Sequence, residues 1–363
     1  MQMSKILIGI SAAILLSTST ILSGAVYAQN SITINGAGAT FPFPLIDTWR
    51  VDYQKVHPEV NINYQSIGSG GGIKQFTEKT VDFGATDAPL SQNESQHAPG
   101  AVHIPETIGS VVAAYNLPSI PDKGLKLSGE VLADIFLGKI TKWNDPKIQD
   151  MNKDKTLPGD DIVVVHRSDG SGTTFVWTDY LSSVSPAWKE QLGKGKSVEW
   201  PVGIGAPGNE GVANAIKGTP NTIGYIELSY ALTTKEPFAF IQNKDGNFVE
   251  ASLNSTMAAV QSYVASLPKG DAVWTNVSLV NAAGADSYPI ASFSYILLYK
   301  ELSTDPNLDQ AKAKALVDFI SWAITDGQKT AEGLDYVPLP DGVVKLNQVT
   351  LKSLTFKGQP IAE

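Results

Sequence analysis

Residues 31–85 read SITINGAGATFPFPLIDTWRVDYQKVHPEVNINYQSIGSGGGIKQFTEKTVDFGA, and they set the α/β character of the chain. Leu45, Trp49, Tyr53 and Val56 follow one another at spacings of four, four and three, which is typical of the apolar face of a helix. Short runs rich in apolar residues alternate with two helical segments, so a β-α-β-α-β unit with mostly parallel strands is predicted. The predicted strands are 31–35, 60–67 and 81–85, and the predicted helices are 44–56 and 72–79.

The rest of the chain continues this alternation over a total of 363 residues. One hydrophobic core rarely extends over so long a chain, so two lobes are expected. Segments 123–126, 150–159 and 193–211 are rich in Pro, Gly and charged residues and are predicted to be surface loops. Further strands are predicted at 111–116, 162–167, 222–227 and 290–300, and further helices at 129–137, 173–183 and 308–325.

The N-terminus has the features of a secretory signal peptide. Lys5 supplies a positive charge, and the apolar segment 6–22 follows it. Residues 26–28 (Val-Tyr-Ala) fit a cleavage site before Gln29, so 1–28 is predicted to be removed. A transmembrane anchor is the alternative, but the apolar run is short and no basic cluster follows it. The sequence has no Cys, so no disulfide or lipid anchor is expected, and a soluble periplasmic protein is predicted.

The composition is that of an acidic globular protein. Hydrophobic residues make up 42% and charged residues 17%, with a formal net charge of −9. This balance argues against nucleic acid or an anionic membrane as the partner. Any bound anion would have to be held by local dipoles and hydrogen bonds rather than by long-range attraction.

Three segments, 36–42 (GAGATFP), 68–72 (GSGGG) and 169–174 (DGSGTT), combine Gly with Ser or Thr between a strand end and a helix start. Helix N-termini present unpaired N–H groups and the positive end of the helix dipole, which together bind oxyanions. One such loop is usually ordinary turn chemistry, whereas three favour an oxyanion site without identifying the anion. None is a Walker A loop, and Phe41 occupies the place of the third Gly of the dinucleotide fingerprint, so nucleotide binding is not expected.

Three charged residues are candidates for the same site. Arg167 ends a predicted strand, where its guanidinium could fork onto two oxygens of a tetrahedral anion. Asp169 could hold that guanidinium in place, and the alternative is an ordinary surface pair between the two. Asp87 precedes Ala-Pro, so from the residues alone it is a turn former.

Across the mature chain the sequence resembles the periplasmic phosphate-binding proteins of ABC phosphate importers, the PstS family. The matching blocks are 36–42, 64–72, 81–85 with 87–90, 137–140 with Trp143, 167–173, 221–225, and 334–336 with 339–340. The resemblance implies an α/β, two-lobed periplasmic binding protein fold (type II), with a mixed β-sheet flanked by helices in each lobe and a ligand cleft between the lobes. It also implies that 29–108 and 291–363 form lobe 1 and that 109–290 forms lobe 2.

The same resemblance implies a phosphate site. Phe41 and Gly172 would act through backbone N–H groups, and Asp169 would orient Arg167. High-affinity binding of inorganic phosphate, and its delivery to the permease subunits and ATPase of the transporter, follow from the resemblance. No catalysis, metal, cofactor or nucleic-acid partner is expected, and the chain is expected to be a monomer. The implied phosphate-binding residues are Thr40, Phe41, Ser69 and Asp87 in lobe 1, and Arg167, Ser171, Gly172 and Thr173 in lobe 2.

Other functions stay open, among them a role in adhesion or sensing. Ser171 could be the nucleophile of a hydrolase or phosphatase, although 169–173 is not a Gly-x-Ser-x-Gly motif and none of the four histidines is a recognisable base. His166, the nearest in sequence, should point to the strand face opposite Arg167. The chain could also bind sulfate or molybdate. Asp87 would decide between these anions, because phosphate keeps a proton to donate to a carboxylate and sulfate does not. This difference predicts that phosphate is preferred over sulfate by about a thousandfold or more.

Overall fold

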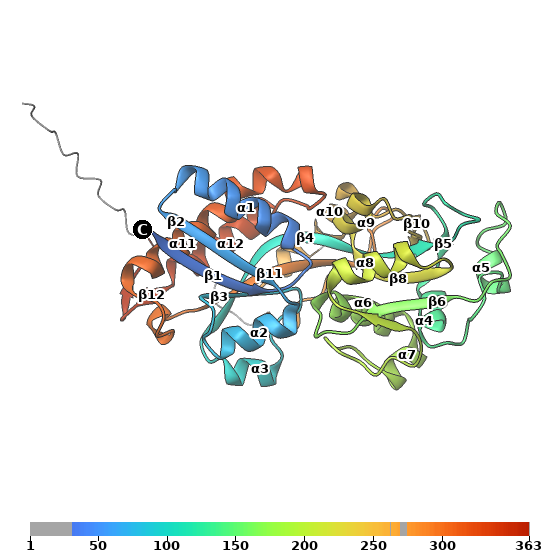
Figure 1. Ribbon diagram of the computed structural model, residues 1–363, viewed down its shortest axis with the longest axis horizontal. Coiled ribbons are helices and arrows are strands. Elements are labelled where there is room, and N and C mark those ends of the chain that lie inside the picture. The colour runs from blue at the N-terminus through green and yellow to red at the C-terminus, as the bar shows by residue number, and fades with distance from the viewer. Residues whose placement is uncertain (1–30, 262, 269–273, 363) are drawn as a thin grey trace, which may run out of the picture. The chain divides into compact units, whose positions relative to one another are not determined.

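The computed structural model describes residues 31–261, 263–268 and 274–362 (Figure 1). The predicted signal peptide, 1–28, lies outside the described residues. Within the described part, no helix joins the length and the apolarity that a membrane crossing requires.

Eight strands form one sheet in the order β2-β1-β3-β11-β4-β8-β6-β7 (Figure 1). At one end β2 (Val60–Ser66), β1 (Ile32–Gly38) and β3 (Phe83–Thr86) run parallel. These are the strands predicted within 31–85, and α1 (Phe43–Val56) and α2 (Ser69–Thr77) connect them as expected. β11 (Ala291–Tyr299) then pairs antiparallel with β3 and with β4 (Ala101–Asn116).

β4 belongs to both halves of the sheet. Up to Ser110 it pairs with β11, and from Val111 onward it pairs with β8 (Thr222–Glu227). The sequence predicted only 111–116 as a strand. The earlier part of β4 carries the buried polar residues His103 and Glu106, which break the apolar pattern by which a buried strand is recognised.

The other end of the sheet contains β8, β6 (Val163–Arg167) and β7 (Ile204–Ala206), all parallel to one another. The prediction that 193–211 is a loop is wrong for its last part, which forms β7 and the first turn of α8 (Gly208–Gly218). Ile204 and Gly205 are exposed, so this short strand has no apolar signature. Its pairing with β6, rather than its composition, orders it.

The predicted helix 44–56 is α1 (Phe43–Val56), which packs Leu45, Trp49 and Tyr53 into the core. Val56, the last residue of α1, is 61% exposed, so the predicted apolar face stops short of it. In Figure 1, α1, α11 (Gln310–Ala323) and α12 (Asp341–Lys352) lie on one side of β1 and β2, and α2 (Ser69–Thr77) and α3 (Gln92–His97) lie on the other.

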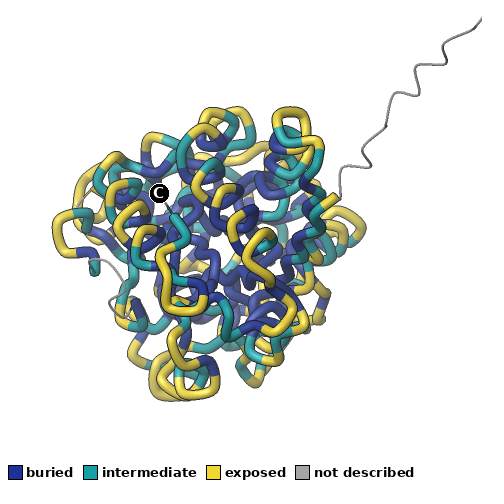
Figure 2. The backbone as a smooth tube through the Cα atoms, turned by 90° about the vertical axis from the view of Figure 1, so that its left-hand side faces the viewer, coloured by how far each residue is buried: buried dark blue, intermediate teal, exposed yellow. Residues whose placement is uncertain are grey.

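The other half of the sheet is covered in the same way by α4 (Gly129–Phe136) and α6 (Gly172–Val184) on one side and by α8 and α9 (Leu228–Thr234) on the other (Figure 1). Buried residues fill the middle of the described chain, and exposed ones form its periphery (Figure 2). The other α-helices and strands of the described residues are α5 (Pro146–Gln149), α7 (Pro186–Gln191), α10 (Leu253–Gln261), β5 (Lys126–Leu127), β9 (Phe240–Gln242), β10 (Phe248–Val249), β12 (Thr355–Phe356) and β13 (Gln359–Pro360).

Candidate functional site

The glycine-containing loops of the two halves of the sheet touch one another. The Gly70 N–H group donates to the Gly170 carbonyl oxygen at 2.8 Å. Gly68 has a φ of +83°, and a Cβ atom there would lie 2.3 Å from Asp169 Oδ2. Only glycine accepts both this backbone conformation and this approach. The loops predicted to share an oxyanion site are therefore brought together.

Arg167 and Asp169 form a two-pronged ion pair. Arg167 ends β6, and its Nε lies 2.7 Å from Asp169 Oδ1 while Nη2 contacts Oδ2. The Arg167 side chain is 1% exposed and that of Asp169 is 23% exposed, so the pair is not the ordinary surface pair considered as the alternative. Burial alone would raise the pKa of Asp169, but the hydrogen bonds and charge of Arg167 outweigh it and lower that pKa.

The third guanidinium nitrogen of Arg167, Nη1, lies near hydroxyl groups from both halves of the sheet. Arg167 Nη1 donates to Thr40 Oγ1 at 3.2 Å and contacts Thr173 Oγ1 at 3.4 Å. Asn209 Nδ2 also donates to Thr40 Oγ1, at 2.8 Å, and to Thr173 Oγ1, at 3.2 Å. All four side chains are buried. The result is a small region with a surplus of hydrogen-bond donors.

Asp87 supplies the acceptor of this region. It follows β3 and is 2% exposed. Its Oδ1 accepts from Ser294 Oγ at 3.0 Å, and its Oδ2 lies 3.5 Å from Ser69 Oγ. Burial raises the pKa of Asp87 to about 7, although the Ser294 hydrogen bond and the charge of Arg167 oppose the rise. A carboxyl group in this state can accept a proton from a ligand near neutral pH.

Gly172 begins α6 and lies against Asp87. A Cβ atom at Gly172 would stand 2.5 Å from Asp87 Oδ2 and 2.4 Å from Ser69 Oγ. Ser171 is the N-cap of α6, since its Oγ accepts from the Thr174 N–H group at 3.0 Å. Its hydroxyl hydrogen can still be donated elsewhere.

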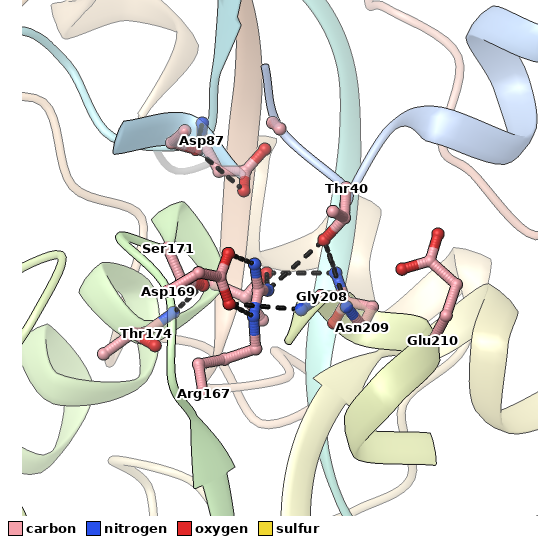
Figure 3. A network of polar contacts seen from close by, with 12 residues as sticks. Thr40, Asp87, Arg167, Asp169, Ser171, Thr174, Gly208, Asn209 and Glu210 are labelled. Carbon is pink, nitrogen blue, oxygen red and sulfur yellow. Dashed lines mark hydrogen bonds and ion pairs between the residues drawn. The ribbon is translucent and has the colours of Figure 1, made fainter. Parts of the chain in front are cut away.

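Phe41 lies beside this region with its ring buried. Its carbonyl oxygen accepts from the Tyr336 hydroxyl group at 2.6 Å. Figure 3 shows Asp87 and Thr40 in the upper part of the view, with the Arg167–Asp169 pair and Asn209 below them. The predicted site residues of the two halves thus gather in one place.

Two residues of this region were not predicted. Asn209 falls in the segment read as a loop, although Pro207 and Gly208 before it repeat the glycine-before-helix pattern of the other three loops. That fourth repetition was a usable signal. Ser294 lies inside β11, and nothing in the sequence marks it.

The histidines do not approach Ser171. His166 Nδ1 contacts the carbonyl oxygen of Arg167 at 3.0 Å, and its ring stacks on Trp200 at 4.9 Å. His103 Nε2 accepts from the Leu90 N–H group at 2.9 Å. No group of His, Asp and Glu side chains suited to a metal ion occurs among the described residues.

Comparisons with known proteins identify the family. The PBP superfamily domain matches residues 24–326. The "Phosphate-binding protein PstS" of Pasteurella multocida is 48% identical over 322 residues, which cover 88% of this chain and 90% of that protein. The protein of the same name from Haemophilus influenzae is 47% identical over 90% of this chain and 93% of its own length. The protein of this name from Methanocaldococcus jannaschii is 41% identical, and the match covers 87% of this chain and 85% of that protein.

Solved structures share the fold. A phosphate-binding protein from Stenotrophomonas maltophilia superimposes with a TM-score of 0.65 at 19% identity, covering 89% of this chain and 94% of its own. A periplasmic phosphate-binding protein bound with phosphate superimposes with a TM-score of 0.64 at 19% identity, and the match covers 89% of this chain and 99% of that protein. The predicted α/β fold of two-lobed periplasmic binding proteins is confirmed. The chain belongs to the PstS family of phosphate-binding proteins, within the PBP superfamily.

Proposed function

We propose that this chain binds inorganic phosphate with high affinity and delivers it to the permease of an ABC phosphate importer. The observation that carries the proposal is the group of buried hydrogen-bond donors around Arg167, together with the buried acceptor Asp87. Phosphate near neutral pH has several acceptor oxygens and at least one hydrogen to donate, because its second pKa is about 6–7. The names of the relatives support the same ligand.

The proposed ligand groups are those implied by the family resemblance. Arg167 would bind two phosphate oxygens with a guanidinium that Asp169 already holds in plane. The N–H groups of Phe41 and Gly172 would complete the shell, and Asp87 would accept the phosphate proton. The hydroxyl groups of Thr40, Ser69, Ser171 and Thr173 would donate the remaining hydrogen bonds, with Asn209 added as a group that orients Thr40 and Thr173.

We further propose the lobe boundaries 29–108 with 291–363, and 109–290. The change of pairing partner along β4, from β11 to β8 between Ser110 and Val111, supports a crossover there. Hinge bending about such crossovers would let phosphate enter and leave. A periplasmic location after removal of 1–28, a monomeric state, and contact with the permease subunits and ATPase of the transporter belong to the same proposal.

Titration calorimetry of the mature chain tests the ligand. We expect phosphate to bind with a dissociation constant of about 1 μM or below, which corresponds to roughly 8 kcal/mol. Arg167→Ala should weaken binding at least about a hundredfold, because it removes a charge-assisted pair of bonds and leaves the partly buried Asp169 without its partner. Arg50→Ala is the matched control, since Arg50 pairs with Asp47 at the surface. A wild-type chain that ignores phosphate, or an Arg50 variant as weak as the Arg167 variant, would refute the site.

Transport and the absence of catalysis are tested separately. The chain should restore phosphate uptake to cells whose own phosphate receptor has been deleted, and the Arg167→Ala variant should not. Incubation with a chromogenic phosphate ester and divalent metal should give no turnover. Turnover that disappears in Ser171→Ala would overturn the receptor in favour of a hydrolase.

A further inference from the structure

One buried hydroxyl group stands between two buried carboxyl groups. Ser294 Oγ lies 3.0 Å from Asp87 Oδ1 and 2.9 Å from Glu106 Oε1. Asp87 is 2% exposed, and neither Glu106 nor Ser294 is exposed at all. Ser294 belongs to β11, Glu106 to the adjacent strand β4, and Asp87 follows β3 on the other side of β11. Three neighbouring strands therefore fix this arrangement.

The hydrogens of this group can be counted. A serine hydroxyl group has one hydrogen, so Ser294 can donate to only one of the two carboxyl oxygens. If both carboxyl groups were ionised, the second contact would set a lone pair of Ser294 against a buried carboxylate oxygen. Such an unpaired buried charge is costly. The arrangement is satisfied when one carboxyl group carries a hydrogen and donates it to Ser294.

Glu106 is the member of the pair with less support for a negative charge. Its Oε2 has no hydrogen-bond partner among the described residues. Burial raises the pKa of Glu106 to about 8; the Ser294 hydrogen bond opposes the rise and the charge of Asp87 adds to it. Asp87, in contrast, is also near Ser69 Oγ and feels the charge of Arg167, both of which favour its ionised form.

We propose that Glu106 is a neutral acid that donates to Ser294 and thereby directs the Ser294 hydrogen onto Asp87, which keeps Asp87 an acceptor for a hydrogen-bearing anion. Glu106 and Ser294 are then positioning residues for ligand selectivity, although neither touches the ligand. This role rests on the proposed binding of phosphate, but the protonation of Glu106 does not.

Infrared difference spectroscopy of the phosphate-free chain tests the protonation. Glu106→Gln keeps the size of the acid and a donor toward Ser294, so the fold is expected to survive. The wild-type spectrum minus the variant spectrum, near neutral pH, should contain the carbonyl stretch of a protonated carboxyl group. A difference that contains only the stretches of a carboxylate would overturn the proposal.

Calorimetry with phosphate and sulfate tests the positioning role. At about pH 9, where Asp87 is ionised in the wild-type chain, Ser294→Ala should reduce the ratio of phosphate affinity to sulfate affinity by about tenfold, since Asp87 loses a hydrogen bond to its charged form. Glu106→Gln should keep both affinities within about threefold, because its amide can donate to Ser294 as the acid does. Ser292→Ala is the control on the same strand: Ser292 Oγ contacts the backbone oxygens of Phe293 at 2.9 Å and of Asp87 at 3.4 Å, but neither carboxyl side chain.

These outcomes separate the two proposals. A Glu106→Gln variant as unselective as Ser294→Ala, or a Ser294→Ala variant with unchanged selectivity, would refute the positioning role. A wild-type chain that shows the protonated carboxyl band but binds no phosphate would refute the proposed function and leave the protonation of Glu106 standing.

Discussion

Replacing Asp87 with Asn should remove the dependence of sulfate binding on pH. Sulfate brings no hydrogen, so the wild-type chain can accept it in two ways only. Either Asp87 takes up a proton and donates it to the sulfate, or two negative groups remain in contact inside a buried site. The Asp87 side chain is 2% exposed, and burial raises its pKa to about 7. The cheaper of the two ways sets the sulfate affinity.

The contact between two charges sets the upper limit of the free energy that sulfate binding loses at Asp87. Two unit charges 4 Å apart repel by about 4 kcal/mol at an effective dielectric constant of about 20, which is a factor of about a thousand in affinity. Protonation is cheaper near neutral pH, because it costs about 1.4 kcal/mol for each pH unit above the pKa of Asp87. Asp87 holds its proton below that pKa and loses it above. Sulfate affinity should therefore be constant below about pH 7 and fall about tenfold per pH unit above it.

Calorimetric titration with sulfate between about pH 6 and pH 9 measures this slope. Phosphate should not share it, since both of its ionised forms in this range carry a hydrogen. In Asp87→Asn the sulfate affinity should be flat with pH. Asp47→Asn, at an exposed ion pair, should behave as the wild-type chain does. A flat wild-type profile, or the same slope in Asp87→Asn, would show that Asp87 is not the group that excludes sulfate.

Three further predictions concern a glycine in close contact with Asp87, a buried carboxyl group, and an ion pair between the two halves of the sheet. Gly172→Ala should weaken phosphate binding about tenfold or more, because its Cβ would meet two side-chain oxygens at 2.4 and 2.5 Å, whereas Gly218→Ala, with no neighbour within 4 Å, should not. Burial raises the pKa of Glu227 to about 8 in the folded chain, so folding favours the protonated carboxyl group. The contribution of this group to the free energy of unfolding is therefore fully present below about pH 4.5 and is lost as the pH rises through 8. Urea unfolding should therefore find Glu227→Gln more stable than wild type at pH 8, by up to about 3–5 kcal/mol, and equal to it near pH 4.5. Glu94→Gln breaks the ion pair of 2.7 Å with Lys196 between the two halves of the sheet, and stopped-flow measurements should show phosphate release faster by less than about fivefold, as for a partly exposed pair.

The sequence predicted the parts of the fold that repeat a local pattern. The apolar face of α1 and the three parallel strands around it follow from spacing within 31–85. The first part of β4 could not be found in this way, because Glu106 and His103 are polar residues in a buried strand. Their places depend on partners in other strands, which no local pattern contains.

The site shows the same division. The pairing of Arg167 with Asp169 joins residues two positions apart, and the sequence suggested it. Asn209 meets Thr40 across 169 positions, and Ser294 meets Asp87 across 207. The first contact joins the two halves of the sheet and the second joins the end of β3 to the neighbouring strand β11, so neither follows from a local pattern. The candidate ligand residues were thus easier to predict than Asn209 and Ser294, which contact them.

The orienting groups explain how an acidic chain can bind an anion. The charge of Arg167 is already matched by Asp169, and the net charge of the whole chain is −9, so no excess of positive charge is available. Thr40 Oγ1 accepts from both Arg167 and Asn209, which leaves its own hydrogen to be donated outward. Recognition then depends on the direction of short hydrogen bonds inside a buried site, where salt screens poorly. Phosphate affinity should therefore change little with ionic strength, and a steep loss in salt would mean that long-range attraction, not hydrogen-bond direction, holds the ion.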